Sequence, residues 1–290
     1  NELYVQSIKE PLIEIFQHKG SSECQLNTLD PFCSFEQLPY KDFRSKFQND
    51  FSQAPKSSFA RDALGEGMLI KNQTNINPFK FGFIGSTDTH LGTPGAVDEE
   101  VFQGHGGAGK SFRESIPDGL PDDIEFNPGG LAVVWSEENS RTAIFNALKR
   151  KEVYGTSGPR FLVRFFLGDN LDEDLCSQST AISSSYKKGV PMGGTLNSND
   201  ISKATLFVSA KADQLMPDQF IEKIQVVKGV LREDQIVTSV HDIQSQSSTD
   251  LNPETCEVVG TGVRSMCAVW SDPNFKQGDE AYYYVRVIAN

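Results

Sequence analysis

The sequence lacks several features that would assign it at once to a familiar class of protein. No apolar run approaches the roughly 20 residues that a membrane-spanning helix needs. Basic residues are outnumbered, 27 Lys and Arg against 39 Asp and Glu, and the net charge of -12 disfavours binding to the phosphate backbone of nucleic acid. The G-x-S-x-G motif of serine hydrolases is missing. We therefore expect neither a membrane span nor a nucleic-acid partner.

Cysteine is scarce, and none of the five cysteines has the C-x-x-C spacing of a zinc knuckle or a redox motif. Cys24 and Cys33 flank a short polar loop, which suggests a local disulfide. Cys256 and Cys267 flank a Gly-Thr-Gly turn and suggest a second one. Cys176 would then pair with a residue outside this stretch of chain. Disulfides indicate an exported or periplasmic protein, whereas five thiols are the alternative for a cytoplasmic one.

A short motif before residue 91 carries the clearest chemical signal. The aromatic-rich run from Pro78 to Ile84 predicts a buried strand, and Asp88 and His90 follow it. If the extended geometry continues, their side chains point to the same side. A carboxylate and an imidazole aimed at one point suit a divalent metal such as Zn, Mn or Fe. A strand end capped by an Asx-turn is the alternative.

A second strand end offers similar residues. His18 comes directly after the apolar segment 11–17, which predicts a strand covered on both faces. Glu23 follows in a loop that could fold back as a ligand or relay a proton. His105 lies in the Gly-rich stretch 91–130, a long loop of the kind that closes over a site. For His18 and His105 a solvated loop position is the alternative.

The composition changes at Pro159 and Arg160, which predicts two domains, 1–159 and 160–290. The first mixes strands with a helix over 137–151 capped by Ser136. The second is rich in β-branched and aromatic runs, which predicts an antiparallel sandwich. Arg160 follows a Thr-Ser-Gly turn and offers its guanidinium to an anionic group, a junction turn being the alternative. The strand-like runs of the second domain are 161–167, 204–210, 221–227, 236–240 and 281–288.

Several segments resemble the DUF3604 family, which belongs to the PHP (polymerase and histidinol phosphatase) superfamily. The resemblance implies the C-terminal part of a distorted PHP-type βα barrel that holds several divalent metals, followed by a mostly β region. Asp88 and His90 match its last metal motif, and His18 matches a histidine at the end of a middle or late strand. The matching segments are 14–24, 85–96, 129–139, 154–160, 188–194 and 267–273.

The resemblance also predicts what is missing. PHP proteins open with an H-x-H motif, but this chain has four histidines and no H-x-H. We therefore expect the C-terminal part of a longer protein, inactive alone, whose N-terminal part completes the barrel. The expected function is a metal-dependent hydrolase, of phosphoesterase type, acting on a small anionic or phosphorylated substrate through a metal-activated water. The alternative is a scaffolding protein with a degenerate barrel, whose β domain recognises a glycan or a protein partner.

Overall fold

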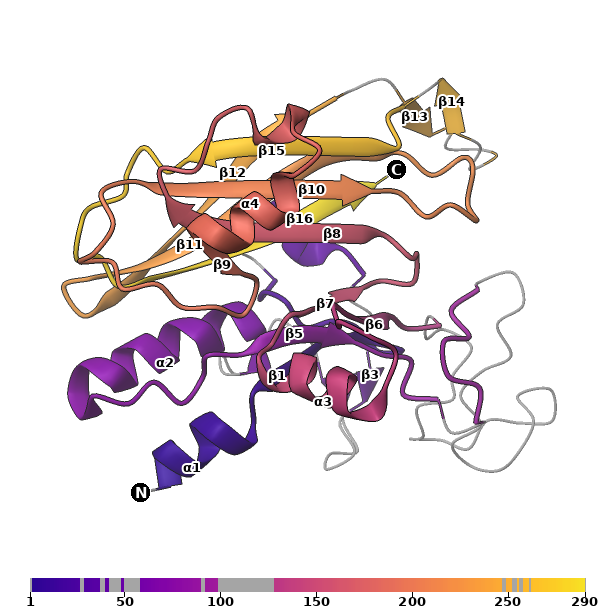
Figure 1. Cartoon of the computed structure of the whole chain (residues 1–290). Coiled ribbons are helices and arrows are strands. Elements are labelled where there is room, and N and C mark those ends of the chain that lie inside the picture. The colour runs from indigo at the N-terminus through magenta and orange to yellow at the C-terminus, as the bar shows by residue number, and fades with distance from the viewer. Residues whose placement is uncertain are drawn as a thin grey trace. The chain divides into compact units, whose positions relative to one another are not determined.

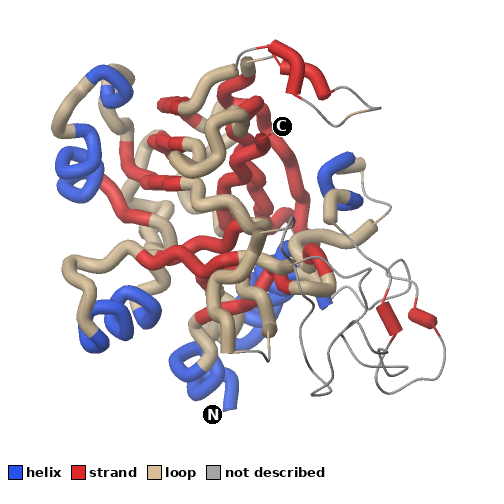
Figure 2. The backbone as a smooth tube through the Cα atoms, turned by 90° about the vertical axis from the view of Figure 1, so that its right-hand side faces the viewer, coloured by secondary structure: helices blue, strands red, loops and turns tan. Residues whose placement is uncertain are grey.

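The computed structural model describes residues 2–26, 29–36, 40–41, 48–49, 58–89, 92–98, 128–246, 249–251, 255, 258–260 and 262–289. The chain divides into two compact units, Asn1–Pro159 and Arg160–Asn290, each described here by itself. The division lies where the composition of the sequence changes. Strands predominate over helices along the described backbone (Figure 2). In these ranges no helix has the length and apolar character to cross a membrane.

The first unit is built on a small sheet with the strand order β2-β1-β5 (Figure 1). β1 and β5 run parallel, with Leu12 opposite Gly82 and Glu14 opposite Ile84. α2 lies between these strands in the chain, where a crossover between parallel strands is needed. The elements of this unit are α1 (Glu2–Lys9), β1 (Leu12–Gln17), β2 (Gly20–Ser21), η1 (Pro31–Ser34), β3 (Tyr40–Lys41), β4 (Gln48–Asn49), α2 (Ala60–Thr74), β5 (Gly82–Gly85), β6 (Leu131–Val134), α3 (Arg141–Lys149) and β7 (Val153–Thr156).

The predicted βα barrel is wrong for this chain. Among the described residues the strands of the first unit form three separate small sheets, β2-β1-β5, β6-β7 and β3-β4, and none of them closes. In the described part of this unit β1 and β5 are the one parallel pair, and β2 joins β1 antiparallel through two residue pairs. A barrel needs every strand to be hydrogen-bonded on both sides. The apolar pattern of a strand shows that it is buried but does not show how many neighbours it has.

The helix predicted over 137–151 is shorter and begins later. Ser140 rather than Ser136 is its N-cap, and the Ser140 hydroxyl accepts a hydrogen bond from the Ala143 N–H at 3.2 Å. The Ser136 hydroxyl instead donates to the Glu138 carbonyl. Ala143 and Ala147 are the buried positions of α3. A serine four residues earlier matched the capping pattern equally well, so local sequence did not decide between them.

Among its described residues the second unit contains two larger antiparallel sheets, in the orders β15-β10-β8-β9 and β12-β11-β16, and the two-stranded antiparallel sheet β13-β14. Its predicted β-rich character is therefore confirmed. The predicted strands correspond to β8, β10, β11, β12 and β16. The elements of this unit are β8 (Leu162–Asp169), η5 (Leu175–Ser177), α4 (Ala181–Lys188), β9 (Gly189–Pro191), β10 (Ala204–Lys211), β11 (Ile221–Arg232), β12 (Gln235–Ser245), β13 (Thr249–Leu251), β14 (Val258–Gly260), β15 (Ser265–Ser271) and β16 (Ala281–Ala289).

β10 is one of the two inner strands of the larger sheet and is covered on both faces. Phe207 belongs to a cluster with Phe166, Leu175 and Ala181, which brings η5 and α4 against one face of the sheet (Figure 1). Leu206, the residue before Phe207, points to the opposite face and is fully buried. α4 was not predicted, because its eight residues include three serines and two lysines and give a weak helical signal.

Candidate functional site

His18 and Asp88, two of the predicted ligands, meet in the first unit. His18 follows β1 and Asp88 follows β5, and parallel strands bring their carboxyl ends to one edge of the sheet. His18 Nε2 lies 3.2 Å from Asp88 Oδ2. The His18 side chain is 4% exposed and that of Asp88 is 44% exposed. The imidazole of the pair is therefore buried, whereas the carboxylate is partly exposed to solvent.

The backbone geometry at Asp88 differs from the extended strand that the sequence predicts there. β5 ends at Gly85, and Asp88 has a φ of 53°, in the left-handed region. The extended alternation expected for Asp88 and His90 therefore does not reach Asp88. The Thr87 hydroxyl accepts a hydrogen bond from the Thr89 N–H and holds this turn. His90 lies outside the described residues.

A polar cluster surrounds the two strand ends. The Ser86 hydroxyl donates to Glu14 Oε1, and Gln17 Nε2 donates to Glu14 Oε2 at 3.0 Å. Lys19 Nζ donates to the Ser22 hydroxyl at 2.5 Å. Burial lowers the pKa of the Lys19 ammonium, and the nearby Glu14 carboxylate opposes that effect. The cluster ties β1 to the residues after β5 and places a cation next to His18 in the chain.

Gly129 is packed so closely against the site that a side chain has no room there. It has a φ of 87°, and an added Cβ would lie 2.7 Å from the Ser86 carbonyl oxygen and 3.1 Å from the His18 backbone nitrogen. Gly92 has a similar φ of 69°, but no atom lies within 4 Å of its would-be Cβ. A side chain would therefore strain the backbone at both positions, but it would collide with neighbouring atoms only at Gly129.

We expect Gly129→Ala to destabilise the protein more than Gly92→Ala. The left-handed backbone should cost each variant about 1–2 kcal/mol, and overpacking should cost Gly129→Ala about 1–3 kcal/mol more. Denaturant unfolding of both variants and the wild type measures the difference. Equal losses would show that the backbone beside His18 tolerates a side chain.

Glu23, predicted as a proton relay or ligand, forms an ion pair. Its Oε1 lies 2.7 Å from Arg61 Nη2, which also binds Asp30 Oδ2 at 2.8 Å. Arg61 is buried in the first turn of α2. Neither Arg61 nor Asp30 was predicted from the sequence to belong to a site. An arginine in a first helical turn, where the helix dipole disfavours a cation, was the available signal of a carboxylate partner.

No contact with His18 or Asp88 is established for the remaining predicted site residues. His105 and Cys256 lie outside the described residues. Arg160 belongs to the second unit, where its backbone N–H donates to Asp213 Oδ2 at 2.8 Å and its side chain is exposed. His241, on β12, lies with its ring 5.1 Å from that of Trp270 and has a structural position.

One of the two predicted disulfides is present in the structure, and the other is replaced by a different pair. Cys24 and Cys33 form the predicted disulfide, with the sulfur atoms 2.08 Å apart. Cys267 bonds to Cys176, not to Cys256, so that prediction is wrong. The reason lies in the fold: Cys267 on β15 is on the sheet face that η5 covers, and η5 carries Cys176. Two disulfides are typical of proteins in an oxidising compartment.

The His18–Asp88 pair fits a divalent metal. With bonds of about 2.0–2.2 Å, two ligand atoms of one ion lie about 3.0 Å apart at a right angle and about 3.4 Å apart in a tetrahedron. The observed 3.2 Å between Nε2 and Oδ2 falls between these values. An imidazole and a carboxylate also match the preferences of Zn, Mn and Fe. Two ligands are fewer than such a site needs, so further ligands must come from outside this pair.

Comparison with known proteins gives one match. The family model described as "Protein of unknown function (DUF3604)" matches residues 1–290. No curated protein and no solved structure matches the chain. The match covers both units, including His18, Asp88 and both disulfides. On this evidence from the whole length of the sequence, the chain belongs to the DUF3604 family.

Proposed function

We propose that the protein binds a divalent metal through His18 and Asp88, with His90 as a third ligand, and that it is a metal-dependent hydrolase. The observation that carries the proposal is the 3.2 Å approach of His18 Nε2 to Asp88 Oδ2 at the shared edge of two parallel strands. These residues are 70 positions apart, and each follows a strand whose end the sequence predicts to carry a metal ligand.

The chain's own residues have distinct tasks in this proposal. His18 is held by burial, so its imidazole keeps one orientation. The exposed Asp88 carboxylate leaves the site open to a substrate. A bound divalent ion supplies Lewis-acid polarisation and a nucleophile at neutral pH. Glu23, paired with Arg61, holds the loop after His18 rather than transferring a proton.

A small anionic substrate, such as a phosphate monoester, is the class that fits these residues best. Lys19 follows the ligand His18 in the chain, and its ammonium lies in the polar cluster with Ser22. Cations of this kind hold phosphoryl oxygens. The net charge of -12 disfavours extended polyanions, so a small substrate is favoured over nucleic acid.

The proposal also includes the superfamily of the protein and its cellular location. The relation to the PHP superfamily rests on His18, Asp88 and His90, and it does not include a barrel in this chain. The location is exported or periplasmic, which the disulfides Cys24–Cys33 and Cys176–Cys267 support.

The test is the metal content and affinity of the full-length protein with His18→Ala and Asp88→Asn combined. We expect metal affinity to fall at least about 100-fold, the upper end of what the loss of an outer-shell partner costs. Hydrolysis of a chromogenic phosphate monoester should fall with it. The matched control is His241→Ala with Asp200→Asn, which removes the same residue types from the second unit.

Unchanged metal stoichiometry in the double variant would contradict the proposal. A wild-type protein that binds no divalent metal would do so too, and it would favour the alternative of a β-rich binding protein for a glycan or protein partner. A protein that binds metal through these residues but hydrolyses no phosphate ester would retain the metal site and refute the substrate class.

A further inference from the structure

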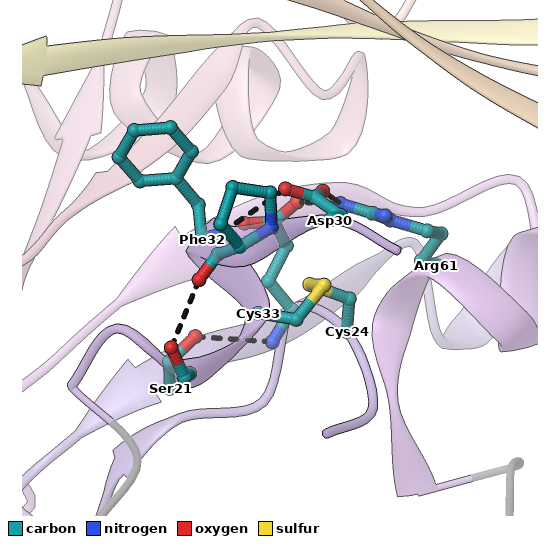
Figure 3. Close-up of a disulfide and its surroundings, with 9 residues drawn as sticks. Ser21, Cys24, Asp30, Phe32, Cys33 and Arg61 are labelled. Atoms are coloured by element: carbon teal, nitrogen blue, oxygen red, sulfur yellow. Dashed lines mark hydrogen bonds and ion pairs between the residues drawn. A yellow bond between two sulfur atoms is a disulfide. The ribbon is translucent and has the colours of Figure 1, made fainter. Parts of the chain in front are cut away.

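A second group of metal-ligand atoms lies around the Cys24–Cys33 disulfide. The two sulfur atoms and a carboxylate oxygen of Asp30 lie within 4.8 Å of one another. All three residues are buried, and Figure 3 shows them gathered with Arg61 in one small region. Nothing in the established family assignment concerns this group. Its chemistry depends on the state of the sulfur atoms.

In the disulfide form the group is not a metal site, because the thiolate is the sulfur species that binds metals. Reduction would produce two thiols beside a carboxylate. Tetrahedral zinc has Zn–S bonds of about 2.3 Å, which places its two sulfur ligands about 3.8 Å apart. The Cα atoms of Cys24 and Cys33 are 5.3 Å apart, so side-chain rotation can supply that separation.

The surrounding contacts hold the three residues near one another without the covalent bond. Asp30 Oδ1 accepts the Phe32 N–H at 3.1 Å, and the Cys33 N–H donates to the Asp30 carbonyl at 3.1 Å. On the other side, the Arg61 N–H donates to the Glu23 carbonyl, next to Cys24, at 2.9 Å. The Arg61 side chain bridges Glu23 and Asp30. Both ends of the loop thus remain attached to the start of α2 after reduction.

The charges of the group also favour a divalent cation in the reduced form. With the disulfide intact, Glu23, Asp30 and Arg61 together carry a net charge of about -1, taking each at its usual ionisation near neutral pH. Two thiolates would add two negative charges, and burying them unpaired is costly. A divalent cation restores the original balance. Arg61 assists, because a nearby guanidinium favours the thiolate form.

We propose that Cys24, Cys33 and Asp30 form a redox-dependent zinc site, closed by a disulfide under oxidising conditions and able to bind Zn²⁺ when reduced. A dithiol or phosphine reductant supplies two electrons, the S–S bond breaks, and each sulfur takes a proton. Zinc binding then releases those two protons. Reoxidation by dioxygen removes two electrons from the two thiolates, forms the S–S bond and releases the zinc ion. The proposal is independent of the metal site at His18 and Asp88.

The second disulfide, Cys176–Cys267, provides an internal comparison. Within the described ranges no carboxylate or histidine forms a comparable three-residue group with its sulfur atoms. Both disulfides yield two thiols on reduction, but only Cys24–Cys33 has a third ligand beside it. Zinc binding should therefore depend on which pair is reduced.

The test compares wild type with Cys24→Ala combined with Cys33→Ala, both full-length and both produced and kept under a phosphine reductant without oxygen. Competition with a colorimetric zinc chelator should show one more zinc ion per chain in the wild type. Cobalt as a probe should give a thiolate charge-transfer band in the wild type alone. Air oxidation should remove both signals from the wild type. The ligands His18 and Asp88 are present in both proteins, so their contribution cancels.

Asp30→Asn in the reduced protein covers the case in which the cysteine variant does not fold. Asparagine keeps the acceptor for the Phe32 N–H and removes the charge, so zinc affinity should fall at least about 10-fold. Equal zinc binding by reduced wild type and the cysteine variant would overturn the proposal, as would unaltered affinity in Asp30→Asn. Alkylation that finds Cys24 and Cys33 still bonded under reductant would overturn it as well.

Discussion

Replacing Lys228 with methionine is expected to lower the free energy of unfolding by about 3–5 kcal/mol, because it leaves a buried carboxylate without its cation. Lys228 Nζ on β11 lies 2.5 Å from Asp272 Oδ2, and the two side chains are 3% and 0% exposed. The Tyr283 hydroxyl donates to the same oxygen at 2.7 Å. The Asn274 N–H donates to the other Asp272 oxygen at 2.9 Å.

The pKa of the Asp272 carboxyl reflects two opposing effects, burial and hydrogen bonding. Burial by itself would raise that pKa, but the hydrogen bonds from Lys228, Tyr283 and the Asn274 backbone outweigh burial and lower it. Burial first, and then the hydrogen bond to Asp272, raise the pKa of the Tyr283 hydroxyl above its usual value. The site therefore keeps Asp272 ionised and Tyr283 neutral.

The pH dependence follows from these directions. Because the folded pKa of Asp272 is below the unfolded value of about 3.9, its contribution is present above that pH and is lost as the pH falls through the folded pKa. In Lys228→Met the Asp272 carboxyl has lost its cation, so its pKa should be raised. The free-energy cost of burying the unpaired carboxylate should then decrease as acidification protonates it. The stability difference between wild type and Lys228→Met should therefore narrow as the pH falls towards about 4.

Lys223→Met is the matched control, on the same strand. Lys223 pairs with Asp242 at 3.4 Å, and the side chains are 27% and 46% exposed, so its loss should cost less than about 1 kcal/mol. Lys228→Met with Asp272→Asn removes both charges and should recover much of the loss. The asparagine oxygen can still accept the Asn274 N–H, and its amide N–H can donate to the Tyr283 hydroxyl oxygen. Urea unfolding over a pH series measures all four proteins. Similar losses in the two single lysine variants would show that burial of the Lys228 pair is unimportant.

Removing the Cys176–Cys267 disulfide is expected to destabilise the protein more than removing Cys24–Cys33. The two bonds span sequence separations of 91 and 9 residues. In the chain-entropy model the longer loop contributes about 4–5 kcal/mol and the shorter about 2–3 kcal/mol. Cys176 is also on η5, which with α4 covers one face of the β10 sheet, so its release loosens that cover.

Denaturant unfolding of Cys176→Ala with Cys267→Ala, against Cys24→Ala with Cys33→Ala, measures the difference. Mass spectrometry of non-reduced peptides should identify a Cys176–Cys267 link in the wild type. A Cys256–Cys267 link would contradict the pairing. A larger loss from the short loop than from the long one would contradict the entropic explanation.

Much of the second unit was predictable from its sequence alone. The β-branched and aromatic runs at 161–167, 204–210 and 221–227 lie within or overlap β8, β10 and β11, because strand propensity and burial are properties of neighbouring residues. The Cys24–Cys33 disulfide was predictable for the same reason, since only a short loop separates its ends. His18 and Asp88 could each be predicted as candidate metal ligands, because each is a ligand-type residue that follows an apolar strand.

Only the tertiary structure decided how these pieces meet. The contact of His18 with Asp88 required the parallel pairing of β1 and β5, and the left-handed turn at Asp88 replaced the alternation expected from sequence. The partner of Cys267 and the bridging role of Arg61 depend on residues 91 and more than 30 positions away in the chain. Strand and helix signals come from adjacent residues, whereas strand neighbours, disulfide partners and buried ion pairs are selected by packing between distant segments, which no local pattern records.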